Sequence, residues 1–208
     1  MPPRGTAGLW SVRILTDFGK STYVLWSLAA ILFIVALISP RLRGTSRSLL
    51  LSFGTRIQFV FFAVLVPVLA GEAIKFIAGR GRPFVGGAGN VFNFAPFAGT
   101  EAHASFPSGH AVASVALALA VSVLWPRARL AMIVYAVLIV ATRLVLVAHH
   151  PSDVVAGALI GVMGVMMVRH WFATRHLGFT IRPDGTIEPL TGPSLTHLKR
   201  VAREAFAP

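Results

Sequence analysis

The feature that most constrains this chain is a stretch of 20 residues without a charge, at positions 21–40. As a helix it would extend about 30 Å, which is the thickness of the hydrocarbon core of a bilayer. Four further apolar runs follow, at 57–75, 110–125, 130–148 and 154–168. A soluble domain is excluded, because 55% of the residues are hydrophobic and only 12% are charged. We therefore predict an all-α fold, a polytopic membrane helix bundle with about five to six transmembrane helices.

The segments outside the apolar runs divide the chain into three parts. Residues 1–20 carry a partial apolar stripe and are predicted to form an interfacial segment before the transmembrane domain at 21–168. A cleavable signal peptide is the alternative, although no small-residue cleavage site closes the run at 21–40. Residues 169–208 are predicted to be a polar cytoplasmic tail, with a turn at 183–185 and a short amphipathic helix at 195–206. Gly157 and Gly161 predict close packing of helices within the chain.

The distribution of basic residues predicts an orientation in the membrane. Of the 19 Lys and Arg residues, Lys75, Arg82 and Arg143 are set aside as site candidates, and 12 of the other 16 fall on one side. The remaining four, which include Arg4 and Arg80, fall on the other side. Because basic residues accumulate in cytoplasmic loops, the chain is predicted to be a multi-pass protein of the plasma (inner) membrane. The basic residues that give the chain its net charge of +12 flank the apolar runs. We therefore expect an anionic lipid surface as partner, and not nucleic acid.

Three polar clusters lie at the extracytoplasmic ends of the predicted helices. The first contains Lys75 and Arg82, the second is residues 107–110, and the third runs from Arg143 to Asp153. Lys and Arg offer only donors, so three converging cations favour a multiply charged anion such as phosphate. Lys75 could instead extend to lipid headgroups, and Glu72 one turn earlier is expected to pair with it.

The second and third clusters contain groups that can transfer a proton or attack phosphorus. Ser108 and Gly109 open a helix whose N–H groups can contact an anion, although Ser108 could serve only as an N-cap. Asp153 follows His149 by four residues and is expected to accept the proton of one ring nitrogen, leaving the other free to attack. His110 can protonate a leaving alkoxide.

A metal site is the alternative use of these side chains. The available ligands would be His103, His110, His149, His150 and Asp153. Three nearby cations oppose a divalent ion, and the absence of cysteine removes thiolate ligands. We therefore expect no metal and no other cofactor.

The three clusters resemble the motifs of the type 2 phosphatidic acid phosphatase superfamily. That pattern is Lys, six residues, Arg-Pro; then Pro-Ser-Gly-His; then Ser-Arg, five residues, His, three residues, Asp. The chain has Lys75 to Arg82-Pro83, the complete second motif at 107–110, and Arg143 to His149 to Asp153. Thr142 replaces the usual serine and keeps the hydroxyl. The resemblance covers about residues 70–160.

The resemblance implies a role for each matched residue. His149 would be the nucleophile that forms a phosphohistidine, Asp153 would orient it, and His110 would be the general acid. The phosphate would be held by Lys75, Arg82, Ser108, Gly109 and Arg143. Arg80, Glu101, His103 and His150 match no motif position. For Arg80 and His103, headgroup contact and a solvated loop position are both open.

The resemblance implies a membrane lipid phosphatase. The candidate substrates are undecaprenyl diphosphate, which is the first choice, phosphatidic acid, phosphatidylglycerophosphate and the lipid A phosphates. Headgroup selection is assigned to residues 79–106. The main alternative is a non-catalytic lipid-binding protein with a vestigial site. Two further alternatives are vanadate-dependent halide oxidation and transport. A soluble scaffold would favour the first, and an internal repeat would favour the second.

Overall fold

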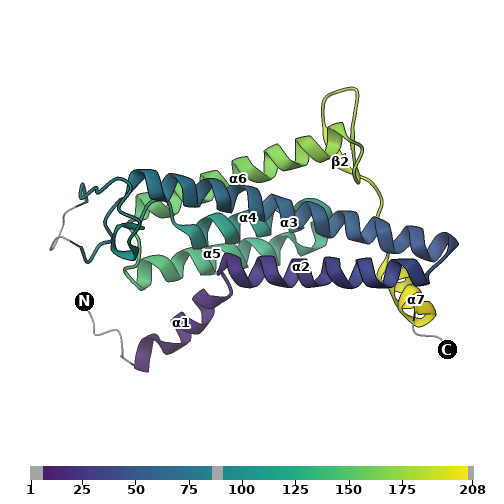
Figure 1. Cartoon of the computed structure of the whole chain (residues 1–208), viewed down its shortest axis with the longest axis horizontal. Helices are drawn as coiled ribbons and strands as arrows, with labels where there is room; N and C mark the ends of the chain where they lie inside the picture. Colours follow the sequence, from purple (N-terminus) through teal and green to yellow (C-terminus); the bar gives the residue numbers. More distant parts are fainter. Residues whose placement is uncertain (1–6, 86–90, 206–208) are drawn as a thin grey trace.

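The computed structural model describes residues 7–85 and 91–205, and five long helices form a bundle along its long axis (Figure 1). They are α2 (Ser21–Ile38), α3 (Gly44–Ala78), α4 (Gly109–Leu124), α5 (Arg129–Val145) and α6 (Pro151–Thr174). In the described part of the chain, four helices are long and apolar enough to cross a membrane, and the fifth, α4, is apolar but has only 16 residues. The predicted polytopic helix bundle is confirmed. The number of spans stays a prediction.

Two helices extend beyond their predicted limits. α3 has 35 residues and begins 13 positions before the predicted start at 57, and it continues through Pro67. At about 1.5 Å per residue it extends about 50 Å, well beyond a hydrocarbon core. α6 continues to Thr174, so the expected boundary after residue 168 falls inside a helix. The predicted limits lie where charged residues interrupt the apolar runs. The backbone hydrogen bonds of a helix do not depend on hydropathy, so the helices continue past these residues.

Small residues bring the central helices together. α4 packs against α3, α5 and α6. A Cβ atom added to Gly161 of α6 would lie 2.8 Å from the Val112 carbonyl oxygen of α4. One added to Gly157 would lie 3.0 Å from the Ala111 Cβ. This close approach confirms the predicted packing role of the two glycines within the chain.

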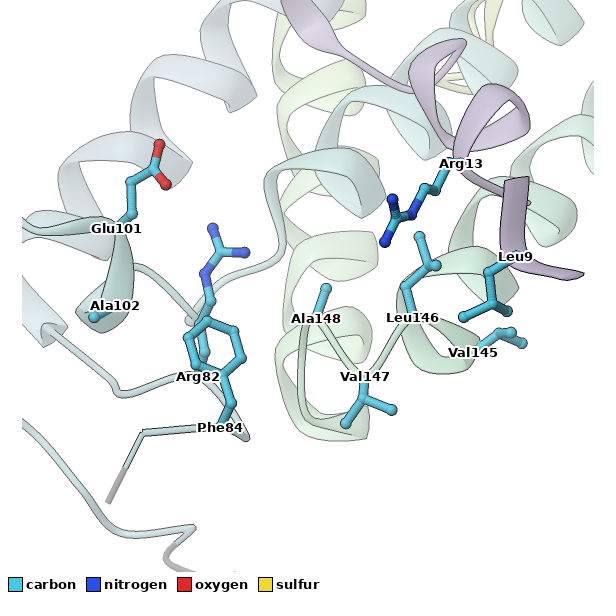
Figure 2. A pocket seen from close by; sticks show the side chains of 10 residues that line it. All are labelled: Leu9, Arg13, Arg82, Phe84, Glu101, Ala102, Val145, Leu146, Val147 and Ala148. Atoms are coloured by element: carbon cyan, nitrogen blue, oxygen red, sulfur yellow. The ribbon is translucent and has the colours of Figure 1, made fainter. Parts of the chain in front are cut away.

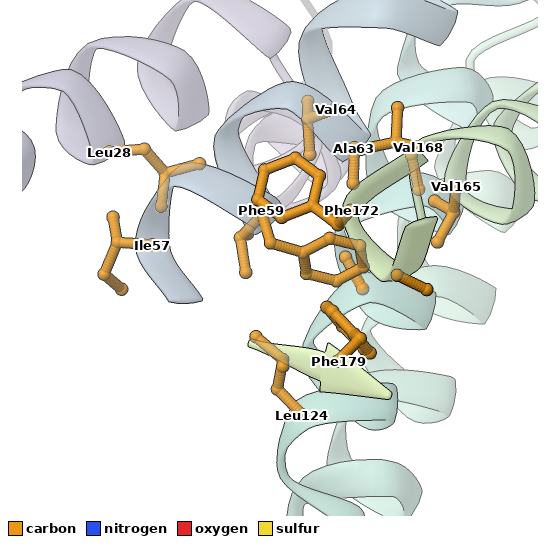
Figure 3. Close-up of a cluster of buried hydrophobic side chains, with 14 of the residues drawn as sticks. Leu28, Ile57, Phe59, Ala63, Val64, Leu124, Val165, Val168, Phe172 and Phe179 are labelled. Atoms are coloured by element: carbon orange, nitrogen blue, oxygen red, sulfur yellow. The ribbon is translucent and has the colours of Figure 1, made fainter. Parts of the chain in front are cut away.

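The main hydrophobic cluster is formed mostly by side chains of α3, α4 and α6, together with Leu28 of α2 and Phe179, which follows α6 (Figure 3). Phe59 of α3 makes edge-to-face contacts with Phe172 and Phe179, with ring centroids 5.5 Å and 4.7 Å apart. By contrast, the outer faces of the helices expose large apolar side chains, such as Trp26 (73% exposed) and Met163 (68%). Such an exterior fits a surrounding of lipid rather than water.

The C-terminal segment packs on one end of the bundle. Strands β1 (Phe179–Ile181) and β2 (Ile187–Pro189) form an antiparallel hairpin, which confirms the predicted turn but adds two strands that were not expected. Arg56 of α3 donates a hydrogen bond to the Leu190 carbonyl after β2. The predicted short helix is present as α7 (Leu195–Ala205), and it packs on α3; residue 206 lies outside the described residues.

The short helices complete the connections. α1 (Trp10–Asp17) contacts α5, exposes Trp10 and buries Thr16. Its helical form agrees with the prediction, whereas a position at the membrane interface stays a prediction. The 3₁₀ turns are η1 (Ala7–Leu9), η2 (Ser39–Arg41), η3 (Glu101–His103) and η4 (Pro126–Ala128). α1, the segment between α3 and α4, and the α5–α6 turn all lie at one end of the bundle (Figure 1). The three polar clusters are therefore at the same end.

Candidate active site

One pocket collects residues from all three polar clusters. It has a volume of about 240 Å³. Six of the residues that the sequence predicts for the site line it, namely Lys75, Arg82, Gly109, His110, Arg143 and His149, whereas Ser108 and Asp153 are not among its lining residues. We call it the phosphate pocket, after the role that the sequence predicts for these residues. These residues come from five parts of the chain, namely α3, the α3–α4 segment, α4, α5 and the α5–α6 turn. Of the predicted residues in this pocket, the two that are farthest apart in the sequence, Lys75 and His149, are separated by 74 positions.

The end of α3 sets the position of the first cluster. Gly79 ends this helix in the left-handed conformation, with φ of 53°, and a Cβ there would overlap the backbone of Ala95. Glycine adopts this conformation without strain, so the chain can turn sharply after the helix. Lys75 lies in the last turn and pairs with Glu72, as predicted. The second cation, Arg82, follows after the turn and borders the same pocket.

The start of α4 presents buried polar atoms beside the pocket. Ser108 is the N-cap residue, and its N–H donates to the Asp153 carbonyl over 2.9 Å. Its hydroxyl makes no capping bond, so the alternative in which Ser108 only caps the helix has no support from this geometry. Within the described residues, the buried Ser108 Oγ and His110 Nε2 atoms have no hydrogen-bond partner. Buried polar atoms are rarely unpaired, so these two are positioned to meet a ligand or water.

The environment of His149 differs from the expected one. Its Nδ1 atom lies 2.7 Å from the Ser105 carbonyl oxygen, and 3.9 Å from Asp153 Oδ2, which is too far for a hydrogen bond. The expected direct bond to Asp153 is therefore wrong. A carbonyl only accepts, so Nδ1 carries the proton and Nε2 keeps its lone pair. Burial, reinforced by the charge of Arg143, lowers the pKa of His149 to about 4, which keeps the ring neutral near pH 7.

Asp153 is connected to His149 by hydrogen bonds through Ser105. This carboxylate is fully buried and accepts hydrogen bonds from Ser105 Oγ at 2.6 Å and from the His150 N–H at 2.9 Å. Its other oxygen accepts from Arg80 Nη1 at 2.6 Å. Arg80 is only 8% exposed, so neither a solvated position nor a headgroup contact describes it. No periodicity or motif spacing in the sequence indicates this pairing.

The metal-site alternative gains no support from the arrangement. Across residues 7–85 and 91–205, the histidines and carboxylates form no group of three or more that could hold a metal ion. His103 is instead 3.3 Å from the Thr100 hydroxyl, and neither His103 nor His150 borders the phosphate pocket.

Comparison with known proteins identifies the family. The model of the PAP2 superfamily matches residues 56–177, a range that contains all three clusters. The chain belongs to the PAP2 superfamily. This confirms the resemblance seen in the motifs, and together with the relatives below it supports a membrane lipid phosphatase.

Two curated relatives of this PAP2 protein are both named Lipid A 1-phosphatase. The one from Rhizobium johnstonii is 35% identical over 177 residues, which cover 83% of this chain and 71% of the relative. The one from Rhizobium etli is 33% identical over 177 residues, which cover 83% of this chain and 75% of the relative. No solved structure gives a significant match.

The candidate site also includes residues that precede the region matched by the family model. Thr16 of α1 is buried, and its Oγ1 accepts a hydrogen bond from Arg143 Nη1 at 2.8 Å. The Thr142 hydroxyl lies 3.0 Å from the same atom. Lys20 borders the phosphate pocket and pairs with Asp17 at 2.8 Å. Sequence reasoning missed Thr16 and Lys20, because only folding brings the first 20 residues next to position 143.

Proposed function

We propose that the protein hydrolyses a lipid phosphate through a phosphohistidine intermediate. The Nε2 atom of His149 attacks phosphorus, and the bond from phosphorus to the lipid oxygen breaks. His110 gives its proton to the departing alkoxide and then takes one from the water that attacks the phosphohistidine. The second step releases inorganic phosphate and regenerates His149. The observation that carries this proposal is the hydrogen bond from His149 Nδ1 to the Ser105 carbonyl, which leaves a lone pair on Nε2. The ring lies beside a pocket lined by four cations, Lys20, Lys75, Arg82 and Arg143.

The charge of the phosphate is balanced by the protein itself. We assign Lys75, Arg82 and Arg143 to this role, with the Ser108 hydroxyl and the backbone N–H of Gly109 as further donors. Phosphoryl transfer depends mainly on positioning and on neutralisation of charge. The reaction is therefore proposed to need neither a metal ion nor another cofactor. A non-catalytic lipid-binding role is disfavoured, because a binding site would not require a histidine held as a neutral nucleophile.

For the substrate, the comparisons change the order of the candidates. Both relatives carry the name Lipid A 1-phosphatase, with 33–35% identity over 83% of this chain. We therefore place a lipid A 1-phosphate ahead of undecaprenyl diphosphate, phosphatidic acid and phosphatidylglycerophosphate. The enzyme is proposed to reside in the plasma (inner) membrane with its site on the extracytoplasmic face and residues 169–208 in the cytoplasm. Its partners would be the bilayer and the lipid phosphate, not nucleic acid.

The test is phosphate release by the purified protein in detergent micelles, with lipid A 1-phosphate and the three other lipids as substrates. We expect release from lipid A 1-phosphate, and reduction to the background rate in His149→Ala. The matched control is His170→Ala, which changes an exposed histidine of α6 and should keep the wild-type rate. Wild-type turnover in His149→Ala would refute the mechanism. Activity lost in a chelator and restored by a divalent ion would favour a metal site instead.

A further inference from the structure

A second cavity, shown in Figure 2, shares Arg82 with the phosphate pocket. Its volume is about 370 Å³, which is within the usual range for sites that bind small molecules. Arg82 borders both cavities, and Ala148 in the wall of the second directly precedes His149. A group covalently joined to a phosphate in the first cavity can therefore reach the second. We call the second cavity the headgroup cavity.

The headgroup cavity combines apolar walls with charges of both signs. Leu9, Phe84 and Val147 contribute apolar surface. Arg13 of α1 and Glu101 of η3 lie on opposite sides of it (Figure 2). An acyl chain would remove these charged groups from water without replacing their hydrogen bonds, which is costly. A cationic group would meet Arg13 and Arg82, and an anionic group would meet Glu101. A neutral group with several hydroxyls and an apolar ring face satisfies the whole lining.

The walls of the headgroup cavity are held by the backbone before any ligand binds. The Arg82 N–H donates to the Ala102 carbonyl at 2.9 Å, which joins the two parts of the α3–α4 segment. The Ala148 N–H donates to the Arg143 carbonyl at 3.1 Å. Val147 has φ of 48°, a conformation that β-branched residues rarely adopt and that is typical of functional sites. A preformed cavity loses less entropy on binding than one that must be ordered.

We propose that the headgroup cavity binds the sugar unit that carries the phosphate, so the substrate is a glycosyl phosphate lipid. This inference rests on the proposed function, in which His149 attacks phosphorus and the sugar hydroxyl leaves with a proton from His110. Glu101 accepts hydrogen bonds from sugar hydroxyls, Arg13 donates to them, and Phe84 packs against the ring.

The experiment compares two substrates that differ only in what carries the phosphate. One is an acylated glucosamine 1-phosphate, and the other is a diacylglycerol phosphate with matched chains. For each, kcat/KM is measured in wild type, Glu101→Gln and Phe84→Ala. We expect the ratio of kcat/KM values, sugar over glycerol substrate, to fall about tenfold in both variants, because lost hydrogen bonds to a charged group and lost ring contacts affect only the sugar. Glu188→Gln, an exposed change in β2 at the other end, should keep the wild-type ratio.

The outcomes separate this inference from the proposed function. An unchanged ratio in Glu101→Gln and Phe84→Ala would overturn the sugar-binding role, even with a normal wild-type rate and an inactive His149→Ala. A parallel loss on both substrates would overturn it too, because it would mean that the residues support the phosphate pocket or the fold. Failure of the wild type to hydrolyse either substrate, or activity of His149→Ala, would instead refute the proposed function itself.

Discussion

At the residue scale, His149, the proposed nucleophile, is positioned by a relay of hydrogen bonds rather than by one carboxylate. Arg80 and Ser105 both donate to Asp153, and the Ser105 carbonyl accepts from His149. Burial of a carboxylate without an ion pair costs free energy, and Arg80 balances the charge of Asp153. The same carboxylate accepts the hydrogen bond of the Ser105 hydroxyl and so fixes this residue. The relay leaves Asp153 without a direct contact to the reacting ring. The position of His149 therefore depends on residues from the α3–α4 segment and from α6.

The first prediction is that Arg80→Ala lowers the free energy of unfolding by about 3–5 kcal/mol, because Asp153 would keep a buried charge without its ion pair. Arg182→Ala is the matched control. It removes an ion pair to Glu188 in which both side chains are about half exposed, and such pairs contribute at most about 1 kcal/mol. Denaturant titration in detergent measures both. Equal losses in the two variants would contradict the assigned role of Arg80.

The second prediction concerns the proton of His149. Its pKa is lowered to about 4 from the ordinary 6.5, so between these values the unfolded chain binds a proton that the folded chain does not. The contribution of this group to stability is therefore complete above pH 6.5 and is lost as the pH falls to about 4. Titration of the imidazole signals by NMR should place the His149 midpoint near 4, with the signal assigned by its loss in His149→Ala. A midpoint at 6.5 or above would exclude a neutral nucleophile at pH 6.

At the element scale, α1 is a part of the site rather than only a helix at its edge. The Tyr135 hydroxyl of α5 donates to the Phe18 carbonyl at 2.9 Å, directly after α1. A Cβ on Gly19 would lie 3.2 Å from His110 Cδ2, so this connection also packs on the proposed general acid. Thr16 of α1 also accepts a hydrogen bond from Arg143 of α5. α1 thus contacts the third motif directly, at Thr142 and Arg143.

The third prediction follows from this contact. Thr16→Val keeps the shape of the side chain but removes the acceptor of Arg143, and hydrogen bonds to charged groups contribute about 1.5–3 kcal/mol. We expect kcat/KM to fall on the order of tenfold or more, mainly through a higher KM. Vanadate, a phosphate mimic that we expect to inhibit the wild type, should inhibit this variant more weakly. Thr16→Ser should restore most of the loss. Thr174→Val, at the exposed end of α6, is the control and should have no effect. A loss that Thr16→Ser does not restore would point to packing instead.

At the scale of the whole molecule, chemistry and basic residues are separated along the bundle. The site lies at the end that carries α1 and the α3–α4 segment, whereas the α2–α3 and α4–α5 connections and α7 lie at the other end (Figure 1). Most of the arginines outside the site belong to that other end, such as Arg41, Arg127 and Arg203. Arg80 does not weaken this asymmetry, because its charge is paired with Asp153. Arg4, counted on the site end, lies outside the described residues.

The fourth prediction tests the orientation that this asymmetry implies. The chain has no cysteine, so single cysteines can be introduced without background. Ala98→Cys lies in the α3–α4 segment at the site end, and Ala128→Cys lies in η4 at the other end. We expect an impermeant thiol reagent to label only Ala98→Cys in intact cells, and both variants after permeabilisation. Labelling of Ala128→Cys alone in intact cells would place the active site in the cytoplasm.

The sequence alone determined the helical membrane fold and the family, and it predicted six of the residues that line the phosphate pocket, although it missed Lys20. Apolar runs of bilayer length and three motifs with fixed spacing are local in the chain, so Lys75, Arg82 and His149 can be identified without coordinates. It did not determine the relay through Ser105, the burial of Arg80 or the role of Thr16. These depend on which side chains meet after the helices pack, and contacts between Thr16 and Arg143 leave no periodic signal. Tertiary structure decided them, because a buried charge takes whatever partner the packed bundle places beside it.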